Sequence, residues 1–301
     1  MLKNNTAENQ YTLLTLLVKT AALGNFTGPG TKLASLPGSM VDVPGILAKG
    51  NVNGTDVELM PYFTGELATT NVNGVPTGVN WLDTNATMLV TNATYVGDAG
   101  SNGGKLFTHL IEYFGAALGC SQYGMSGFPA YAGDNSMTNV HRFMDLNAAQ
   151  VTWFIQNVGL SAKSFGAADA DITAVGMELS TLFNYRCAPA TKVIPNTPAE
   201  LQAICLASSC PISPNATCAA YTNVASTVAT ASTYMPASSA SGSMSSASAS
   251  MSSGMASGSA TAASSGMASS TSGMAASTGA AVANGVSGVL ALVAGAAAFA
   301  L

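Results

Sequence analysis

The sequence predicts an all-α fold: one helical domain with a long irregular insertion, followed by a disordered tail rich in Ser, Ala, Gly and Met. Apolar residues recur at helical spacing in several segments of the first 190 residues. No Asp, Glu, Lys or Arg follows Glu200, whereas an ordinary globular domain is about 25% charged. The expected parts are a domain at 1–190 with its insertion at about 64–104, a Cys-containing extension at 191–225, a disordered stalk at 226–284 and a hydrophobic segment at 285–301.

The first expected helix is Tyr11–Leu23, in which apolar residues lie three and four positions apart and which ends at Gly24. Gly, Pro, Asn and Thr are frequent in residues 26–104, which also contain short pieces of extended character such as Thr87–Val96. We therefore expect little or no helix in this stretch. Long loops of this kind are usually functional or mobile.

Helical spacing returns at Lys105, where apolar residues form one broad face that ends at Gly119. Asn147 is expected to cap a later helix, and Asp169 or Asp171 to cap the last one. The sequence thus predicts three further helices, at Met137–Met144, Ala148–Leu160 and Ile172–Tyr185.

The charge balance excludes a nucleic-acid binder. The chain of 301 residues has 9 Lys and Arg against 14 Asp and Glu, a formal net charge of −5 and a pI near 4.8. Proteins that bind nucleic acid need clustered positive charge. We therefore expect no nucleic-acid partner.

The C-terminal segment has the layout of a lipid-attachment signal. Val286–Leu301 is apolar and uncharged, and small residues precede it across a short polar spacer. This resembles the signal for a glycosylphosphatidylinositol (GPI) anchor, and a membrane helix is the alternative. Both interpretations place the domain outside the cytosol, although Met1–Gln10 is polar. The chain either begins part-way into its gene product or has a weak signal peptide that ends near Gly24.

Cysteines and glycosylation sequons agree with an extracellular location. Four clustered cysteines allow two disulfides in three pairings, and Cys120 stands apart. Six Asn-x-Ser/Thr sequons support the same conclusion. The clustered cysteines are Cys187, Cys205, Cys210 and Cys218, and the sequons begin at Asn4, Asn25, Asn53, Asn85, Asn92 and Asn215.

Both histidines of the chain, His109 and His141, lie on apolar helical faces, where a histidine is usually part of the core. The residues around them carry a family pattern. Tyr113–Gly119 reads YFGAALG, Tyr131–Gly133 reads YAG, and Met137–His141 reads MTNVH. In this order the motifs resemble the truncated (two-over-two) haemoglobins, particularly group I. The resemblance covers about 80 residues, Lys105–Phe183.

This resemblance implies a haem b cofactor whose iron is bound by His141, the proximal ligand of the family. Phe63 corresponds to the family's phenylalanine at the haem corner, and Arg142 or Lys163 is expected to pair with a propionate. Met137, Val140 and Phe154 are expected on the proximal side, with Phe114 enclosing the ring. On the distal side the family's polar pair is replaced by Leu106 and Leu110, while His109 is expected at the pocket mouth or as a sixth ligand.

The sequence therefore favours a secreted or cell-surface haem protein that binds O2, NO or CO and is attached to the membrane through a lipid anchor. The reaction, if there is one, stays open. The alternative is a structural or adhesive wall protein that retains a globin-derived fold without haem. A third interpretation, a fasciclin-type adhesion module, depends only on Leu17–Gly30 (LVKTAALGNFTGPG).

Overall fold

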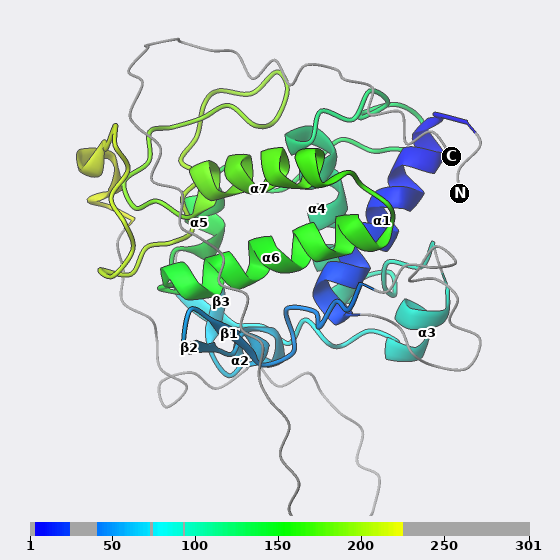
Figure 1. Ribbon diagram of the computed structural model, residues 1–301, viewed down its shortest axis with the longest axis horizontal. Coiled ribbons are helices and arrows are strands. Elements are labelled where there is room, and N and C mark those ends of the chain that lie inside the picture. Colours follow the sequence, from blue (N-terminus) through cyan, green and yellow to red (C-terminus); the bar gives the residue numbers. More distant parts are fainter. Residues whose placement is uncertain (1–3, 25–40, 73–74, 93, 225–301) are drawn as a thin grey trace, which may run out of the picture. The chain divides into compact units, whose positions relative to one another are not determined.

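The computed structural model describes residues 4–24, 41–72, 75–92 and 94–224 (Figure 1). The expected stalk at 226–284 and the hydrophobic segment at 285–301 lie outside these residues, as does the Asn25 sequon. The elements, in chain order, are α1 (Ala7–Leu23), β1 (Gly50–Val52), β2 (Thr55–Val57), α2 (Met60–Thr64), β3 (Ala68–Val72), β4 (Val75–Gly78), α3 (Ala86–Thr91), α4 (Asn102–Ala117), α5 (Met137–His141), α6 (Ala148–Ser164), α7 (Asp169–Phe183) and the 3-10 turn Cys218–Tyr221.

The fold is mostly α, but the expectation of an all-α chain is wrong, because the described residues also contain two small antiparallel hairpins. β1 pairs with β2 across the turn at Asn53 and Gly54, which have φ of 50° and 85°. An Asn-Gly pair adopts such left-handed backbone readily, and this favours a two-residue hairpin turn. β3 pairs with β4, with a register irregularity between Ala68 and Thr70.

Helix α3 corrects a second expectation, that Thr87–Val96 is extended. The residues Ala86–Thr91 form a helix instead. The side chain of Asn85 accepts a hydrogen bond from Met88 N at 3.0 Å, so it caps the helix. This local cap favours a helical turn in spite of the β-branched residues in the segment.

The caps of the longer helices agree with the sequence in one case and differ in another. Asn147 caps α6 as expected: its side chain accepts from Gln150 N, and the Gln150 side chain accepts from Asn147 N. The last helix differs, because Ala168 is its N-cap residue and no side chain caps it. Asp169 and Asp171 lie in the first turn of α7 instead, where carboxylates interact favourably with the helix dipole.

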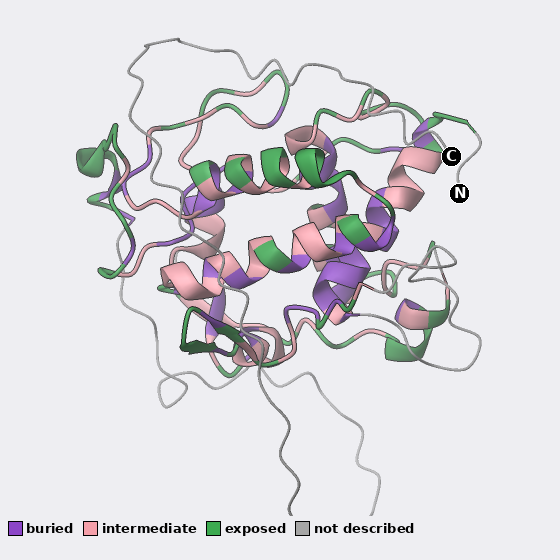
Figure 2. Cartoon of the chain, viewed as in Figure 1, coloured by how far each residue is buried: buried purple, intermediate pink, exposed green. Residues whose placement is uncertain are grey.

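The long helices form the core. α1 packs against both α4 and α6, and α6 packs against α7. Figure 2 shows α1 largely buried, whereas α7 presents an exposed outer face. The β1–β2 hairpin covers part of α6, where a Cβ on Gly50 would lie 2.5 Å from the Trp153 ring. A glycine is therefore required at that point of the hairpin. None of the helices in the described ranges is long and apolar enough to cross a membrane.

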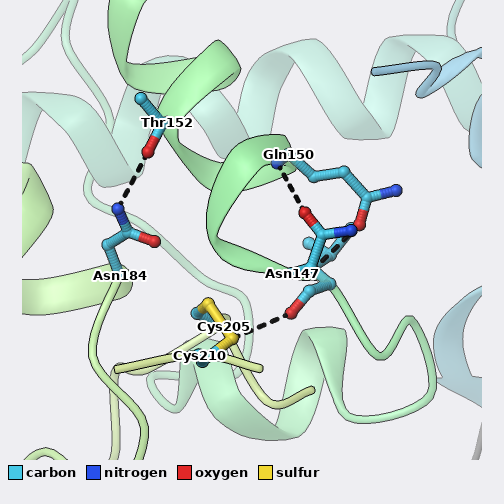
Figure 3. The surroundings of a disulfide bond; sticks show 7 residues. Asn147, Gln150, Thr152, Asn184, Cys205 and Cys210 are labelled. Atoms are coloured by element: carbon cyan, nitrogen blue, oxygen red, sulfur yellow. Dashed lines mark hydrogen bonds between the residues drawn. A yellow bond between two sulfur atoms is a disulfide. The ribbon is translucent and has the colours of Figure 1, made fainter. Parts of the chain in front are cut away.

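Residues 184–224, called the C-terminal extension below, begin before the extension expected at 191–225. They add little regular structure but pack on the helical domain. Isolated bridges join Leu146 to Cys205, Arg186 to Ile212, and Thr191 to Glu200. The disulfides of the extension are Cys187–Cys218 and Cys205–Cys210 (the latter in Figure 3), which selects one of the three pairings that the sequence left open. Cys120 is a free cysteine.

Candidate functional site

The His141 side chain has the hydrogen bonding of a metal ligand. It is the last residue of α5, and its Nδ1 lies 2.8 Å from Met137 O, one helical turn earlier. A carbonyl oxygen only accepts, so Nδ1 carries the proton and the lone pair of the ring is on Nε2. Nε2 has no hydrogen-bond partner among the described residues. Metal-binding histidines usually donate their second ring N–H in this way.

Burial keeps this imidazole neutral. It lowers the pKa of His141, and the hydrogen bond to Met137 O opposes that shift. A metal ion binds the neutral ring, because protonation of Nε2 removes the lone pair. His141 is therefore in the protonation state that a metal requires at neutral pH.

Three of the apolar residues expected in the site meet between α1, α4 and α6. Leu110, Phe114 and Phe154 line a wholly apolar cavity of about 50 Å³. The Phe114 and Phe154 rings lie 6.2 Å apart between centroids. The cavity can hold an apolar molecule of diatomic size but is far too small for a porphyrin, and none of its lining residues comes from α5. The full lining is Leu14, Leu17, Val18, Ala21, Ala22, Ile46, Leu110, Phe114, Leu118, Phe154 and Val158.

The remaining residues expected on α4 are more exposed. Leu106 is half-buried, and His109 is exposed at the surface. The His109 ring packs edge-on against Tyr131, with centroids 5.4 Å apart, and Tyr131 in turn packs against Tyr113. Partial desolvation of its ring, which packs against Tyr131, lowers the pKa of His109, and the positive charge of Lys105 lowers it further. The structure thus brings His109 to an aromatic cluster, and no contact joins it to His141.

Helix α2 brings the Phe63 segment to the end of the α5 region. The Tyr62 hydroxyl donates to Met144 O at 2.8 Å, three residues beyond His141. Tyr62 is buried, and Phe63 is half-buried against the main core. The segment with Phe63, the phenylalanine expected at the haem corner, therefore lies on the same side of the fold as His141.

The other residues expected around His141 lie on or just after α5. Met137 is buried, and Val140 is half-buried against the core. Arg142 Nη2 donates to Asn223 O at 3.3 Å, and its guanidinium lies 4.7 Å from the centre of the Phe143 ring. The structure therefore directs Arg142 towards the C-terminal extension.

Two features of this region were not predictable from a local sequence pattern. One is the packing of Leu201–Cys210 against α5, for which the only sequence signal is the single polar residue Gln202 within the otherwise apolar run Leu201–Ala207. The other is Glu112, which lies buried on α4 and whose pKa is raised by burial to about 7. Nothing in the helical periodicity distinguished Glu112 from a solvent-facing carboxylate.

Comparisons of the chain with models of protein families, with curated proteins and with solved structures find no match. Within the described ranges, no three His, Cys, Asp or Glu side chains are grouped so that they could hold a metal ion. His141 is the centre of the candidate site.

Proposed function

We propose that the chain is a secreted, truncated-globin-like haem protein that binds a diatomic gas, O2, NO or CO, at an iron held by His141. The observation that carries this proposal is the hydrogen bond from His141 Nδ1 to Met137 O, which leaves Nε2 as a free ligand. One strong axial imidazole is enough for a haem iron, because the porphyrin supplies the other four nitrogens.

Three of the apolar residues expected around the haem are only half-buried: Val140, Phe63 and Leu106. An apolar macrocycle that covers their exposed surface is stabilised by the hydrophobic effect. When bound, the haem supplies reversible coordination of a gas, and this chain supplies the axial ligand and an apolar enclosure.

Helix packing supports the truncated-globin comparison. The helices that resemble the family's distal helix (α4), proximal helix (α5) and last two helices (α6 and α7) occur in the family order, with α6 packed on α7. The motif residues Tyr113 and Phe114 are buried where α4 meets this core. The two hairpins and the extension are additions to that pattern.

The distal side favours weak retention of O2. Leu106 and Leu110 are the residues that correspond to the family's polar pair, and neither can donate a hydrogen bond to bound gas. His109 is held against Tyr131 at the surface, which favours iron with a vacant sixth position. We expect O2 to dissociate quickly, and no enzymatic reaction is assigned.

The proposed location is the outer face of the plasma membrane or the cell wall, with attachment through a lipid anchor. Disulfides Cys187–Cys218 and Cys205–Cys210 fit an oxidising compartment. Several sequons present their asparagine on the exposed surface, as at Asn4, Asn53 and Asn215, where a glycan has room.

The test is a haemin titration of the full chain secreted by a eukaryotic host, followed by its Soret absorption. We expect a band that saturates at one haemin per chain. His141→Ala should abolish it, and His109→Ala, the matched change at the other histidine, should retain it.

Two results contradict the proposal. One is a folded, helical protein that develops no saturable Soret band, which leaves the haem-free structural protein as the function. The other is an unchanged band in His141→Ala, which shows that a different residue binds the iron.

A further inference from the structure

The loop between α4 and α5, residues 119–135 and called the aromatic loop below, is anchored by one phenylalanine. Phe128 is completely buried, whereas the residues on either side of it are exposed. Its ring lies over Gly115 of α4, where a Cβ would overlap the ring. Tyr11 of α1 and Tyr123 of the loop pack edge-on against the same ring, with centroids 5.5 and 5.6 Å away. The loop is therefore closed over the junction of α1 and α4, which pack against each other.

Glu112 lies beneath this loop. It is three residues before Gly115, so the two residues share a face of α4, and it is only 5% exposed. The negative charge of Glu112 raises the pKa of Tyr11, Tyr123 and Tyr131, because these three side chains lie near its carboxyl group. Within the described ranges, no hydrogen bond or ion pair reaches that carboxyl group. The loop thus covers a carboxyl group that has no partner there.

Among the described residues that pack here, no cation compensates a charge on Glu112. The two basic side chains of α4 itself, Lys105 and His109, are exposed. Lys19, the basic residue of α1, donates instead to two carbonyl oxygens in the loop after α3. The other titratable side chains of α1 and those of the aromatic loop are neutral or acidic, namely Glu8, Tyr11, Cys120, Tyr123, Tyr131 and Asp134.

The two hydroxyls of the loop have partners within the loop itself. Tyr123 Oη accepts from Tyr131 N at 2.7 Å, and Tyr131 Oη donates to Asp134 O at 3.0 Å. A carboxylate that is removed from water without such a partner is disfavoured against its neutral form. Burial accordingly raises the pKa of Glu112 from 4.5 to about 7. The loop can cover the neutral acid, whereas the carboxylate requires water.

We propose that Glu112 is a pH-sensitive latch: the aromatic loop is closed over it while it is protonated and loosens from α1 and α4 when it ionises. The closed state holds the proton more tightly than the open one. Its stabilisation is therefore complete below about pH 4.5 and is lost as the pH rises through about 7. The latch needs no bound cofactor, so it stands or falls independently of the proposed function.

The experiment is amide hydrogen exchange of the full chain without haemin at pH 5.5 and pH 8.0, with each rate divided by the intrinsic rate at that pH. We expect the opening constant of the aromatic loop to be about 25-fold larger at pH 8.0, which is the ratio that pKa values of 7 for the closed state and 4.5 for the open state give. The amides of α6 should stay better protected than the loop at both pH values, because the opening is local.

Glu112→Gln keeps the size of the side chain and cannot ionise, so its loop should open equally at both pH values. Glu8→Gln is the matched control. Glu8 lies against Gly127 of the same loop but is exposed, and its loss should leave the 25-fold change in place. If Glu112→Gln does not fold, the unaltered protein decides: the opening constant must stop rising at the pH where the Glu112 carboxyl carbon titrates in the NMR spectrum.

Three results overturn the latch. One is an opening constant in the unaltered protein that is equal at pH 5.5 and pH 8.0. Another is a rise that persists in Glu112→Gln, which assigns it to a different group. The third is a single opening constant shared by the loop and α6 at both pH values, which shows that the chain unfolds as a whole and the loop does not open separately.

Discussion

Lys19 shows how far one residue departs from its usual environment. It lies on α1, is completely buried, and donates through Nζ to Asn92 O at 2.7 Å and to Tyr95 O at 2.9 Å. A neutral amine has two N–H bonds for these two acceptors, whereas an ammonium has three. Burial removes water from the charged form and lowers the pKa of Lys19 from 10.5 to about 8.

This lowered pKa predicts a pH dependence of stability. Between about pH 8 and 10.5 the unfolded chain binds the proton that the folded Lys19 has lost, so the free energy of unfolding rises with pH. The limiting slope is about 1.4 kcal/mol per pH unit. Lys19→Met should remove this contribution from urea unfolding measured between pH 7.5 and 9.5.

The control for this prediction is Lys192→Met, at an exposed lysine, which should leave the slope unchanged. Burial also raises the pKa of Cys120 to about 11 and that of Tyr131 to about 12, and both shifts oppose the rise. Since these groups are the same in every variant, the difference between slopes isolates Lys19. Equal slopes for the unaltered protein and Lys19→Met contradict the prediction.

At the scale of residues, candidate side chains were easier to predict from the sequence than the environments in which they lie. His141 was selected through a motif, and its bond to Met137 O follows from helical spacing alone, since the two residues are four positions apart. Lys19 and Glu112 fall within helices whose apolar pattern is imperfect. Their burial depends on what the loop after α3 and the aromatic residues around α4 place over them, and a local pattern does not contain that information.

At the scale of elements, the cap of α6 carries the next prediction. Asn147→Ala removes the bond from Gln150 N and leaves only the other half of the capping box, the bond from the backbone N–H of residue 147 to the Gln150 side chain. We expect a loss of about 1 kcal/mol in the free energy of unfolding. Asn85→Ala is the comparison: it removes the same bond from the short helix α3, which buries only Leu89, so the loss should be smaller. A larger loss for Asn85→Ala contradicts this ranking.

The five long or motif-bearing helices were predictable because each has apolar residues at helical spacing and turn residues at its ends. The hairpins were not predicted, since each strand has only three to five residues and shows too few alternations to establish a period of two. The Asn53–Gly54 pair was the available signal for β1–β2. In β3–β4 the partner strand supplies the hydrogen bonds, and no single segment indicates that pairing.

At the scale of the whole molecule, the C-terminal extension links stability to the candidate site. The sequence separated it as a Cys-containing segment and left its role open, because disulfide pairing does not follow from spacing. In the structure the two disulfides have different surroundings. Cys187 of the Cys187–Cys218 disulfide belongs to a small second core with Ala188, Ala203 and Tyr221, and Cys218 is exposed. Both Cys205 and Cys210 belong to the main core, beside the corner between α5 and α6.

This difference predicts that the two disulfides rank in opposite order for stability and for haemin retention. Cys187–Cys218 spans 31 residues and Cys205–Cys210 spans 5, so loop-closure entropy gives contributions of about 4 and about 2 kcal/mol to the free energy of unfolding. Replacing Cys187 and Cys218 together by Ser should therefore lower the urea midpoint more. Replacing Cys205 and Cys210 by Ser should accelerate haemin release more, because that pair closes the segment bound to α5. If one double variant has the larger effect in both measurements, the extension acts through global stability alone and the segment Leu201–Cys210 has no separate influence on His141.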